Sequence, residues 1–200
     1  STQGIPLNAS AAGGSAIYAT EGDTIILTAA HFCTAFDGMD NVDVSFQAYM
    51  SDGTAYDAEV VALDEQLDLC LMRADGFWRS FLNVMRNPAT LDDQAFLENY
   101  GTPLGIFEGV DFGLLENTPS GEYVLFRNIG FYSGIFNDRL FASTIPVKGG
   151  QSGSPVLHNG MMVGMIVMGI ENAEHICFAV RADVIREFLL EHNIHLLYLE

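Results

Sequence analysis

Turn-forming residues recur along this chain about every eight to twelve positions, and this spacing restricts the folds that it can adopt. Runs of β-branched and aromatic residues separate the turns, a pattern typical of a sandwich or barrel and not of strands that alternate with helices. The expected turns are at residues 13–14, 21–23, 37–38, 51–53, 119–121 and 159–160. The pattern therefore predicts an all-β fold.

A polar segment at residues 86–98 separates two β-rich halves. We interpret it as a linker between an N-terminal β-barrel, residues 1–85, and a C-terminal β-barrel, residues 99–200. The chain has 200 residues, 49% of them hydrophobic, which is enough for two small barrels that share one interface. Apolar residues recur at helical spacing near the end, so the second unit is expected to finish with a helix at residues 182–192.

A serine lies between glycines at residues 149–156, GGQSGSPV. A hydroxyl group attacks a carbonyl only if a base takes its proton and hydrogen-bond donors stabilise the developing oxyanion. Gly150 can adopt backbone angles that turn successive N–H groups inward, and Gly153 allows a substrate chain to approach closely. We interpret this segment as a nucleophile loop, with Ser152 as the nucleophile.

Two further segments supply the groups that such a serine requires. Residues 24–31, TIILTAAH, have the pattern of a strand that ends in small residues and then delivers His31. Residues 67–72, LDLCLM, place Asp68 at the head of an apolar strand, where a largely buried carboxylate needs a partner. Asp64 lies in a polar stretch just before and is interpreted as a solvated turn residue.

These three segments, in this order, resemble the signature blocks of chymotrypsin-like serine peptidases. The resemblance implies two six-stranded antiparallel β-barrels followed by a C-terminal helix. It also implies that His31 is the general base, Asp68 its orienting partner and Ser152 the nucleophile. The backbone N–H groups of Gly150 and Ser152 would then form the oxyanion hole.

The resemblance is closest to the Do-like, or high-temperature-requirement, branch of this family. Residues 100–113 are similar to the strand and loop that open its second barrel, and residues 163–169 to its substrate-binding strand. Residues 178–180 are similar to its closing strand. We expect a protease domain of this branch without the PDZ module.

The resemblance also bears on activation and specificity. Gln151 stands where zymogen-activated relatives have an acidic residue that pairs with a freed N-terminus, so no such switch is expected. Pro146 stands where trypsin-like pockets have an aspartate that binds lysine or arginine. We therefore expect an apolar side chain of modest size, and not Lys or Arg, before the scissile bond, at the P1 position. The expected pocket residues are Pro146, Val147, Val167, Met168 and Gly169.

The formal net charge is −18, from 26 acidic and 8 basic side chains. A surface of this sign repels nucleic-acid phosphates and acidic membranes, so neither is an expected partner. No apolar run reaches membrane-spanning length, and we expect a soluble protein. The histidines lack the spacing of metal ligands, and the predicted chemistry needs no cofactor, so we expect neither a metal nor a cofactor.

The three cysteines, Cys33, Cys70 and Cys177, stand in unlike contexts with no regular spacing. Cys33 has no upstream cysteine to pair with, and the other two lie in apolar runs typical of small core residues. We therefore expect no disulfide framework, which favours a reducing compartment without identifying it.

Taken alone, the sequence predicts a serine endopeptidase that hydrolyses polypeptide substrates through an acyl-enzyme. Two alternatives stay open at this stage. One is a catalytically silent or conditionally active protease fold that serves as a binding or structural module, for instance in a viral particle or a larger assembly. The other is an esterase that acts on small esters. The sequence does not define the oligomeric state.

Overall fold

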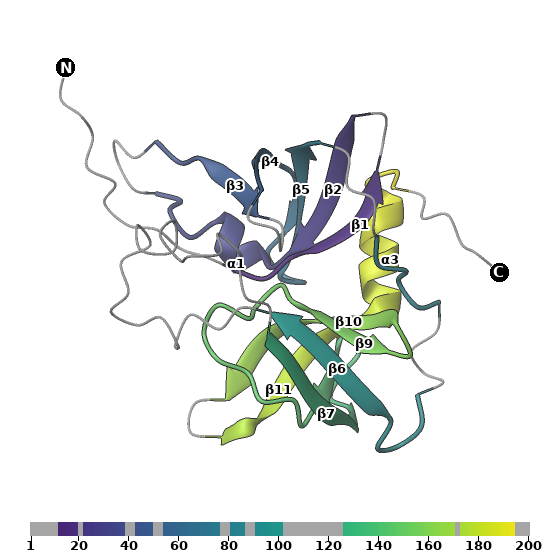
Figure 1. The fold of residues 1–200 in the computed structure, drawn as a ribbon. Coiled ribbons are helices and arrows are strands. Elements are labelled where there is room, and N and C mark those ends of the chain that lie inside the picture. The colour runs from purple at the N-terminus through teal and green to yellow at the C-terminus, as the bar shows by residue number, and fades with distance from the viewer. Residues whose placement is uncertain are drawn as a thin grey trace.

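The computed structural model describes residues 12–19, 22–38, 43–49, 54–76, 81–86, 91–101, 126–170 and 173–194. Figure 1 shows that these residues form two β units, with a C-terminal helix that lies alongside both. None of the helices in these ranges is long and apolar enough to cross a membrane.

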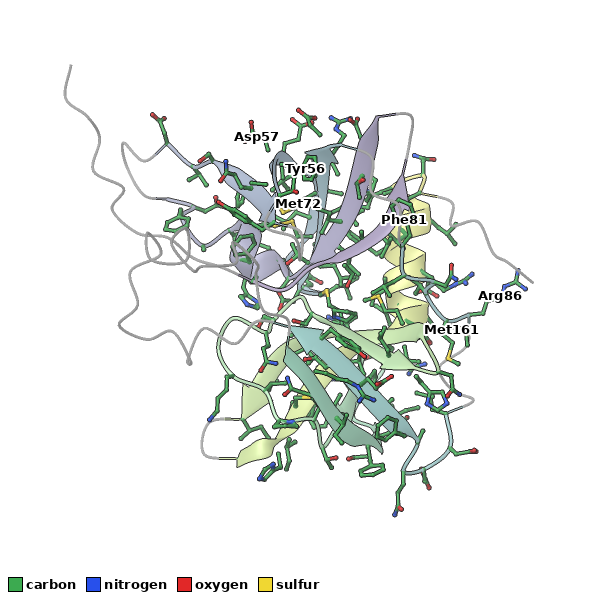
Figure 2. The ribbon with its side chains drawn as sticks, viewed as in Figure 1. Tyr56, Asp57, Met72, Phe81, Arg86 and Met161 are labelled. Carbon is green, nitrogen blue, oxygen red and sulfur yellow. A yellow bond between two sulfur atoms is a disulfide. The ribbon has the colours of Figure 1, made fainter. Side chains whose placement is uncertain are left out.

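The N-terminal unit is an antiparallel sheet with the strand order β1-β2-β5-β4-β3. Its strands are β1 (Ser15–Ala19), β2 (Asp23–Thr28), β3 (Phe46–Tyr49), β4 (Ala55–Asp64) and β5 (Leu69–Asp75). β2 and β5 are buried on both faces, which explains their nearly continuous apolar sequences. Leu27 faces the interface with the second unit, whereas Ile26 and Met72 belong to a separate cluster within the sheet. Figure 2 shows Met72 inside this unit and Asp57 at its outer rim.

The C-terminal unit is a closed barrel with the strand order β10-β11-β8-β7-β6-β9. Its strands are β6 (Phe96–Gly101), β7 (Phe126–Ile135), β8 (Leu140–Ser143), β9 (Pro155–His158), β10 (Met161–Ile170) and β11 (Ala173–Arg181). Leu97, Phe141 and Ile166 are among the side chains that fill it, each almost completely buried. At Gly164 an added Cβ would lie 2.5 Å from the Phe141 ring, so glycine leaves the space that this ring needs.

A two-residue turn joins β9 and β10. His158 pairs with Met161, and Asn159 and Gly160 between them have φ angles of 51° and 77°. Both angles lie in the left-handed region, where asparagine and glycine are the favoured residues of such hairpins. The turn that the sequence predicts at residues 159–160 is confirmed.

The helix α3 (Ala182–Glu191) covers the interface between the two units. One apolar cluster joins the sheet, the barrel and the helix: it includes Ile17, Ile25, Leu27, Leu69, Leu71, Met162, Met165, Val180, Ile185, Phe188 and Leu189. Full burial of one such side chain contributes about 1.5–3 kcal/mol. The contact between the units is therefore a continuous core and not a surface contact.

The all-β fold with two β units and a C-terminal helix is confirmed. Within the described ranges the C-terminal unit has six strands and is closed, while the N-terminal unit has five. Residues 100 and 101 of the segment expected to open the second barrel lie in β6, and residues 102–125 fall outside the described ranges. The linker at residues 86–98 stays a prediction.

Candidate active site

His31 and Asp68 lie at the same end of two neighbouring strands. β2 ends at Thr28 and is followed by the short helix α1 (Ala30–Cys33), which carries His31. Asp68 directly precedes β5. Because Thr28 pairs with Cys70 in the ladder between β2 and β5, the two strand ends bring a histidine and a carboxylate into contact across 37 positions of sequence.

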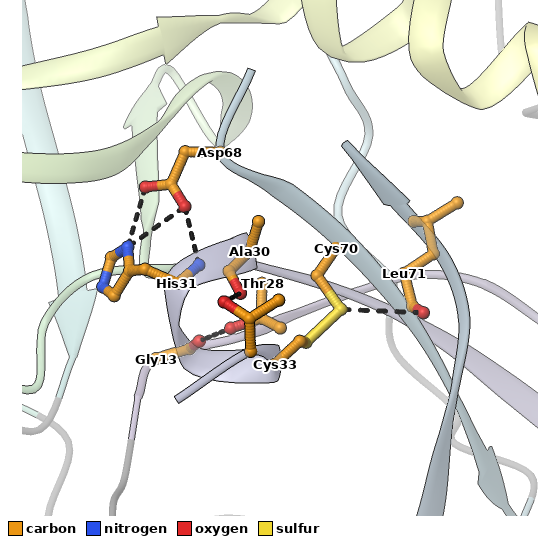
Figure 3. Close-up of a disulfide and its surroundings, with 9 residues drawn as sticks. Gly13, Thr28, Ala30, His31, Cys33, Asp68, Cys70 and Leu71 are labelled. Carbon is orange, nitrogen blue, oxygen red and sulfur yellow. Dashed lines mark hydrogen bonds and ion pairs between the residues drawn. A yellow bond between two sulfur atoms is a disulfide. The ribbon is translucent and has the colours of Figure 1, made fainter. Parts of the chain in front are cut away.

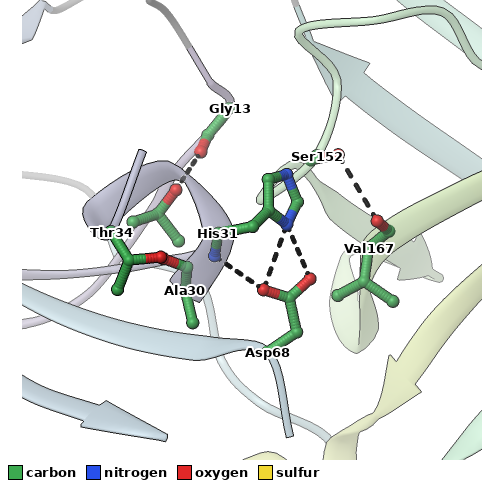
Figure 4. Close-up of polar contacts among 8 residues, drawn as sticks. Gly13, Ala30, His31, Thr34, Asp68, Ser152 and Val167 are labelled. Atoms are coloured by element: carbon green, nitrogen blue, oxygen red, sulfur yellow. Dashed lines mark hydrogen bonds and ion pairs between the residues drawn. The ribbon is translucent and has the colours of Figure 1, made fainter. Parts of the chain in front are cut away.

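The Asp68 carboxylate binds His31 at its backbone and at its ring (Figure 4). Oδ1 accepts a hydrogen bond from the His31 N–H at 2.9 Å, and the ring Nδ1 lies 3.1 Å from Oδ1 and 2.8 Å from Oδ2. An ionised carboxylate only accepts, so Nδ1 carries a hydrogen and neutral His31 keeps a lone pair on Nε2. The hydrogen bond to Asp68 raises the pKa of His31 above 6.5; partial burial opposes this rise, and the negative charge of Asp68 adds to it.

The turn before β5 fixes the position of Asp68. Asp64 Oδ1 accepts hydrogen bonds from the N–H groups of Gln66, at 2.8 Å, and Leu67, at 2.9 Å. Arg139 of the C-terminal unit donates from Nη1 to the Gln66 carbonyl at 3.1 Å. Asp68 has a φ of 55°, a left-handed conformation that aspartate tolerates better than most residues. Asp64, expected only as a solvated turn residue, therefore shapes the turn that presents Asp68.

Ser152 lies in a loop before β9 whose shape depends on two glycines. Gly150 and Gly153 have φ angles of 87° and 83°, which L-residues with a side chain rarely adopt. The Gly153 N–H donates to the Ile166 carbonyl on β10 at 2.7 Å. Within the described ranges, the N–H groups of Gly150 and Ser152 donate no hydrogen bond to a backbone carbonyl.

The hydroxyl of Ser152 bonds a backbone carbonyl of β10. In the view of Figure 4, Ser152 lies on the opposite side of the His31 ring from Asp68. Its Oγ donates to the Val167 carbonyl at 3.5 Å, and no hydrogen bond joins it to His31 among the residues that the structure describes. Catalytic hydrogen bonds are often long or absent in ligand-free enzymes and tighten when substrate binds.

A segment of the N-terminal unit binds the Ser152 loop, and this contact was not predicted from the sequence. The Gly13 N–H donates to the Ser152 carbonyl at 2.8 Å, and the Gly13 carbonyl accepts from Thr28 Oγ1 at 2.6 Å. An added Cβ at Gly13 would lie 2.1 Å from Ser154 Oγ. The available signal was the glycine pair at residues 13–14, which we interpreted only as a turn.

The residues expected to line the P1 pocket lie on two segments that contact each other. Val167, Met168 and Gly169 belong to β10, and Pro146 and Val147 precede the Ser152 loop. An added Cβ at Gly169 would lie 2.8 Å from Val147 Cγ2, so the valine side chain lies against the glycine backbone. Apolar groups therefore occupy the space between these segments.

We expected no disulfide framework, and the structure corrects this expectation with one disulfide (Figure 3). Cys33, at the end of α1, and Cys70, in β5, form a disulfide with Cα atoms 6.7 Å apart. The ladder that brings His31 to Asp68 also brings these cysteines together, because each follows one of the two residues by two positions. The ground for favouring a reducing compartment is thereby removed. Cys177 is the buried core thiol that we expected, and burial raises its pKa to about 11.

Within the described ranges, no group of three or more His, Cys, Asp or Glu side chains could hold a metal ion. A hollow of about 530 Å³ on the C-terminal barrel includes none of the candidate site residues. It is lined by Asp93, Gln94, Phe131, Tyr132, Ser133 and Thr144.

The fold pairs a β-sheet, which carries a histidine bonded to a carboxylate, with a closed β-barrel, which carries a serine in a glycine loop. These features are those of the class of trypsin-like peptidases. Sequence comparison leads to the same class. Residues 14–165 match the family model described as the trypsin-like peptidase domain, and the chain belongs to this family.

The relatives that the chain resembles are serine proteases of the HTRA type. It is 26% identical to serine protease HTRA1 of Xenopus tropicalis over 185 residues, which is 92% of this chain and 37% of that protein. It is 25% identical to serine protease HTRA4 of Mus musculus over 172 residues, 86% of this chain and 32% of that protein. The chain thus spans about a third of the length of these relatives, and the similarity to the Do-like branch is confirmed.

We expect the Cys33–Cys70 disulfide to stabilise the N-terminal sheet. It closes a loop across 37 positions, and the loop-entropy model assigns such a cross-link about 3–4 kcal/mol. Replacing both cysteines by alanine should lower the free energy of unfolding by that amount in denaturant titrations. Without reductant, alkylation of the unfolded wild-type chain should modify Cys177 alone, and modification of all three cysteines would contradict the disulfide.

Proposed function

We propose that this chain is a serine endopeptidase domain that hydrolyses peptide bonds through an acyl-enzyme. The observation that carries the proposal is the carboxylate of Asp68, which accepts hydrogen bonds from both the N–H and the Nδ1 of His31. This contact fixes the ring in the tautomer that presents a basic Nε2, and Ser152 lies on that side of the ring in Figure 4. The serine proteases among its relatives support the same chemistry.

In the proposed reaction, Ser152 Oγ leaves Val167, transfers its proton to His31 Nε2 and attacks the peptide carbonyl carbon. The resulting oxyanion accepts hydrogen bonds from the N–H groups of Gly150 and Ser152. The intermediate collapses, the C–N bond breaks and the leaving amine takes the proton from His31. A water molecule, deprotonated by His31, then attacks the acyl-enzyme carbonyl. The ester C–O bond breaks, His31 returns the proton to Ser152 Oγ, and the acid product leaves, while Asp68 stabilises the imidazolium in both steps.

The substrate chain is proposed to bind beside the end of β10. β9 pairs with β10 only as far as Met165, whereas β10 continues to Ile170, so its last residues have no strand of β9 beside them. A peptide in extended conformation can add to such an edge through main-chain hydrogen bonds. Val147, packed against Gly169, would then limit the P1 side chain to a small apolar one such as alanine or valine.

A conditionally active module is the second candidate, and one observation favours it. Among the residues that the structure describes, Ser152 Oγ donates to Val167 and not to His31. If this arrangement persisted when a peptide binds, the chain would bind peptides without cleaving them. The experiment with Ser152 below separates the two functions, because a silent module would not be labelled by a reagent that needs an activated serine.

Replacing Ser152 by alanine should abolish both peptide cleavage and labelling by a fluorophosphonate probe, with a loss of kcat of about 10⁶-fold. Ser154→Ala is a matched control in the same loop, because Ser154 Oγ is buried and has no hydrogen-bond partner among the described residues. The control should keep both activities. Labelling that persists in Ser152→Ala would show that another residue is the nucleophile.

The activity should depend on pH through His31. Only neutral His31 accepts the serine proton, and the hydrogen bond to Asp68 raises the pKa of His31. The kcat/KM value should therefore fall as the pH is lowered, with a midpoint above 6.5. In Asp68→Asn the causes of the rise are lost, so an NMR titration of His31 should give a lower midpoint than in the wild type; an unchanged midpoint would contradict the assigned contact.

Val147→Ala should widen the P1 pocket beside Gly169. We expect the preference in a peptide library to move from alanine and valine toward leucine and methionine, by about 10- to 100-fold in the ratio of kcat/KM values. Val61→Ala makes the same change at an exposed position of β4 and should leave the preference unchanged. A wild-type profile dominated by Lys, Arg or Glu at P1 would refute the apolar pocket.

A further inference from the structure

Gln151, the residue before Ser152, is buried and binds its own loop. Only 1% of its surface is exposed. Its side-chain Oε1 accepts a hydrogen bond from the Lys148 N–H at 2.6 Å, and its backbone N–H donates to the Lys148 carbonyl at 3.2 Å. These two bonds close a tight turn around Gly149 and Gly150. The N–H of Gly150 is one of the two proposed for the oxyanion hole.

Asn99 on β6 connects this turn to the barrel. It is completely buried, and its Oδ1 accepts a hydrogen bond from Gln151 Nε2 at 3.3 Å. Its Nδ2 donates to the Pro155 carbonyl at 2.9 Å. One asparagine side chain thus contacts the chain just before Ser152 and again just after it.

The neighbouring position on the same face of β6 leaves room for these contacts. Side chains two residues apart on a strand point the same way, so Gly101 faces the loop together with Asn99. An added Cβ at Gly101 would lie 2.5 Å from Ser154 Oγ and 3.5 Å from Gln151 Cγ. The inner face of β6 is therefore shaped to receive residues 151–155.

We propose that Asn99 is a positioning residue for the Ser152 loop, acting through Gln151 and Pro155. The inference rests on the proposed function, because the N–H groups that it orients are those of the oxyanion hole. Glycine allows many backbone conformations, so the glycines of this loop do not by themselves favour the observed one. Contacts with neighbouring residues must stabilise it. The neutral side-chain amides of Asn99 and Gln151 provide this stabilisation. They do not titrate and bury no charge.

Asn99→Leu keeps a side chain of similar size and removes both hydrogen bonds. We expect kcat to fall about 10- to 100-fold while KM stays within about threefold, because the loop N–H groups bind the oxyanion of the transition state and not the ground state. A peptide boronic acid, which forms a tetrahedral adduct with the serine, should lose affinity by the same factor. Asn128→Leu is the matched control: Asn128 lies on β7, opposite Asn99 in the ladder between β6 and β7, and this variant should keep the wild-type kcat.

Asn99→Asp tests the role through the pH dependence of kcat, which a purely structural role would not change. The new carboxyl group can donate to the Pro155 carbonyl only when it is protonated. The ratio of variant to wild-type kcat should therefore decrease as the pH rises, at temperatures where circular dichroism shows both proteins to be folded. A ratio that does not change with pH would contradict the proposal.

Experiments can distinguish failure of the proposed function from failure of the proposed role of Asn99. A wild-type chain that neither cleaves peptides nor reacts with a fluorophosphonate refutes the endopeptidase. Deuterium exchange of residues 148–155 still tests Asn99 in that case: faster exchange in Asn99→Leu than in Asn128→Leu supports the positioning role. Equal exchange, or a folded Asn99→Leu variant with wild-type kcat, overturns it.

Discussion

The contact between Asp68 and His31 is the interaction on which the rest of the site depends. A partly buried carboxylate exchanges part of its hydration for hydrogen bonds from the protein. The donors are the backbone and the ring of His31, and they reach Asp68 only in one register of β2 on β5. That same register sets the Cys33–Cys70 disulfide, so the position of the histidine is fixed by a hydrogen-bonded pair and by a covalent link.

Local chemistry explains which features could be predicted from the sequence. The glycines around Ser152, the small residues before His31 and the apolar strand after Asp68 each show their chemistry within a few residues. The alternation of turns and apolar runs identified the β fold in the same way. The disulfide between Cys33 and Cys70 has no such local sign, because it exists only once β2 and β5 are paired in register.

Gly13 and Asn99 show why the remaining parts of the site could not be predicted. Each lies far from Ser152 in sequence, and neither stands in a motif that chemistry alone would single out. Gly13 matters because its backbone binds the Ser152 carbonyl, and backbone contacts leave little trace in residue type. Asn99 matters because it is buried and bonded on both sides, which an isolated asparagine in a strand-like run does not reveal.

The Ser152 loop is thus attached to both units, and this makes the interface between them part of the site. Gly13 approaches it from the N-terminal unit, and Asn99 approaches it from the barrel. His31 belongs to the N-terminal unit, so any displacement of one unit against the other would loosen the Gly13 contact and change the separation of His31 and Ser152 together. The apolar cluster beneath α3 resists such a displacement because it buries side chains of both units at once. The position of His31 relative to Ser152 therefore depends on hydrophobic packing as well as on polar contacts.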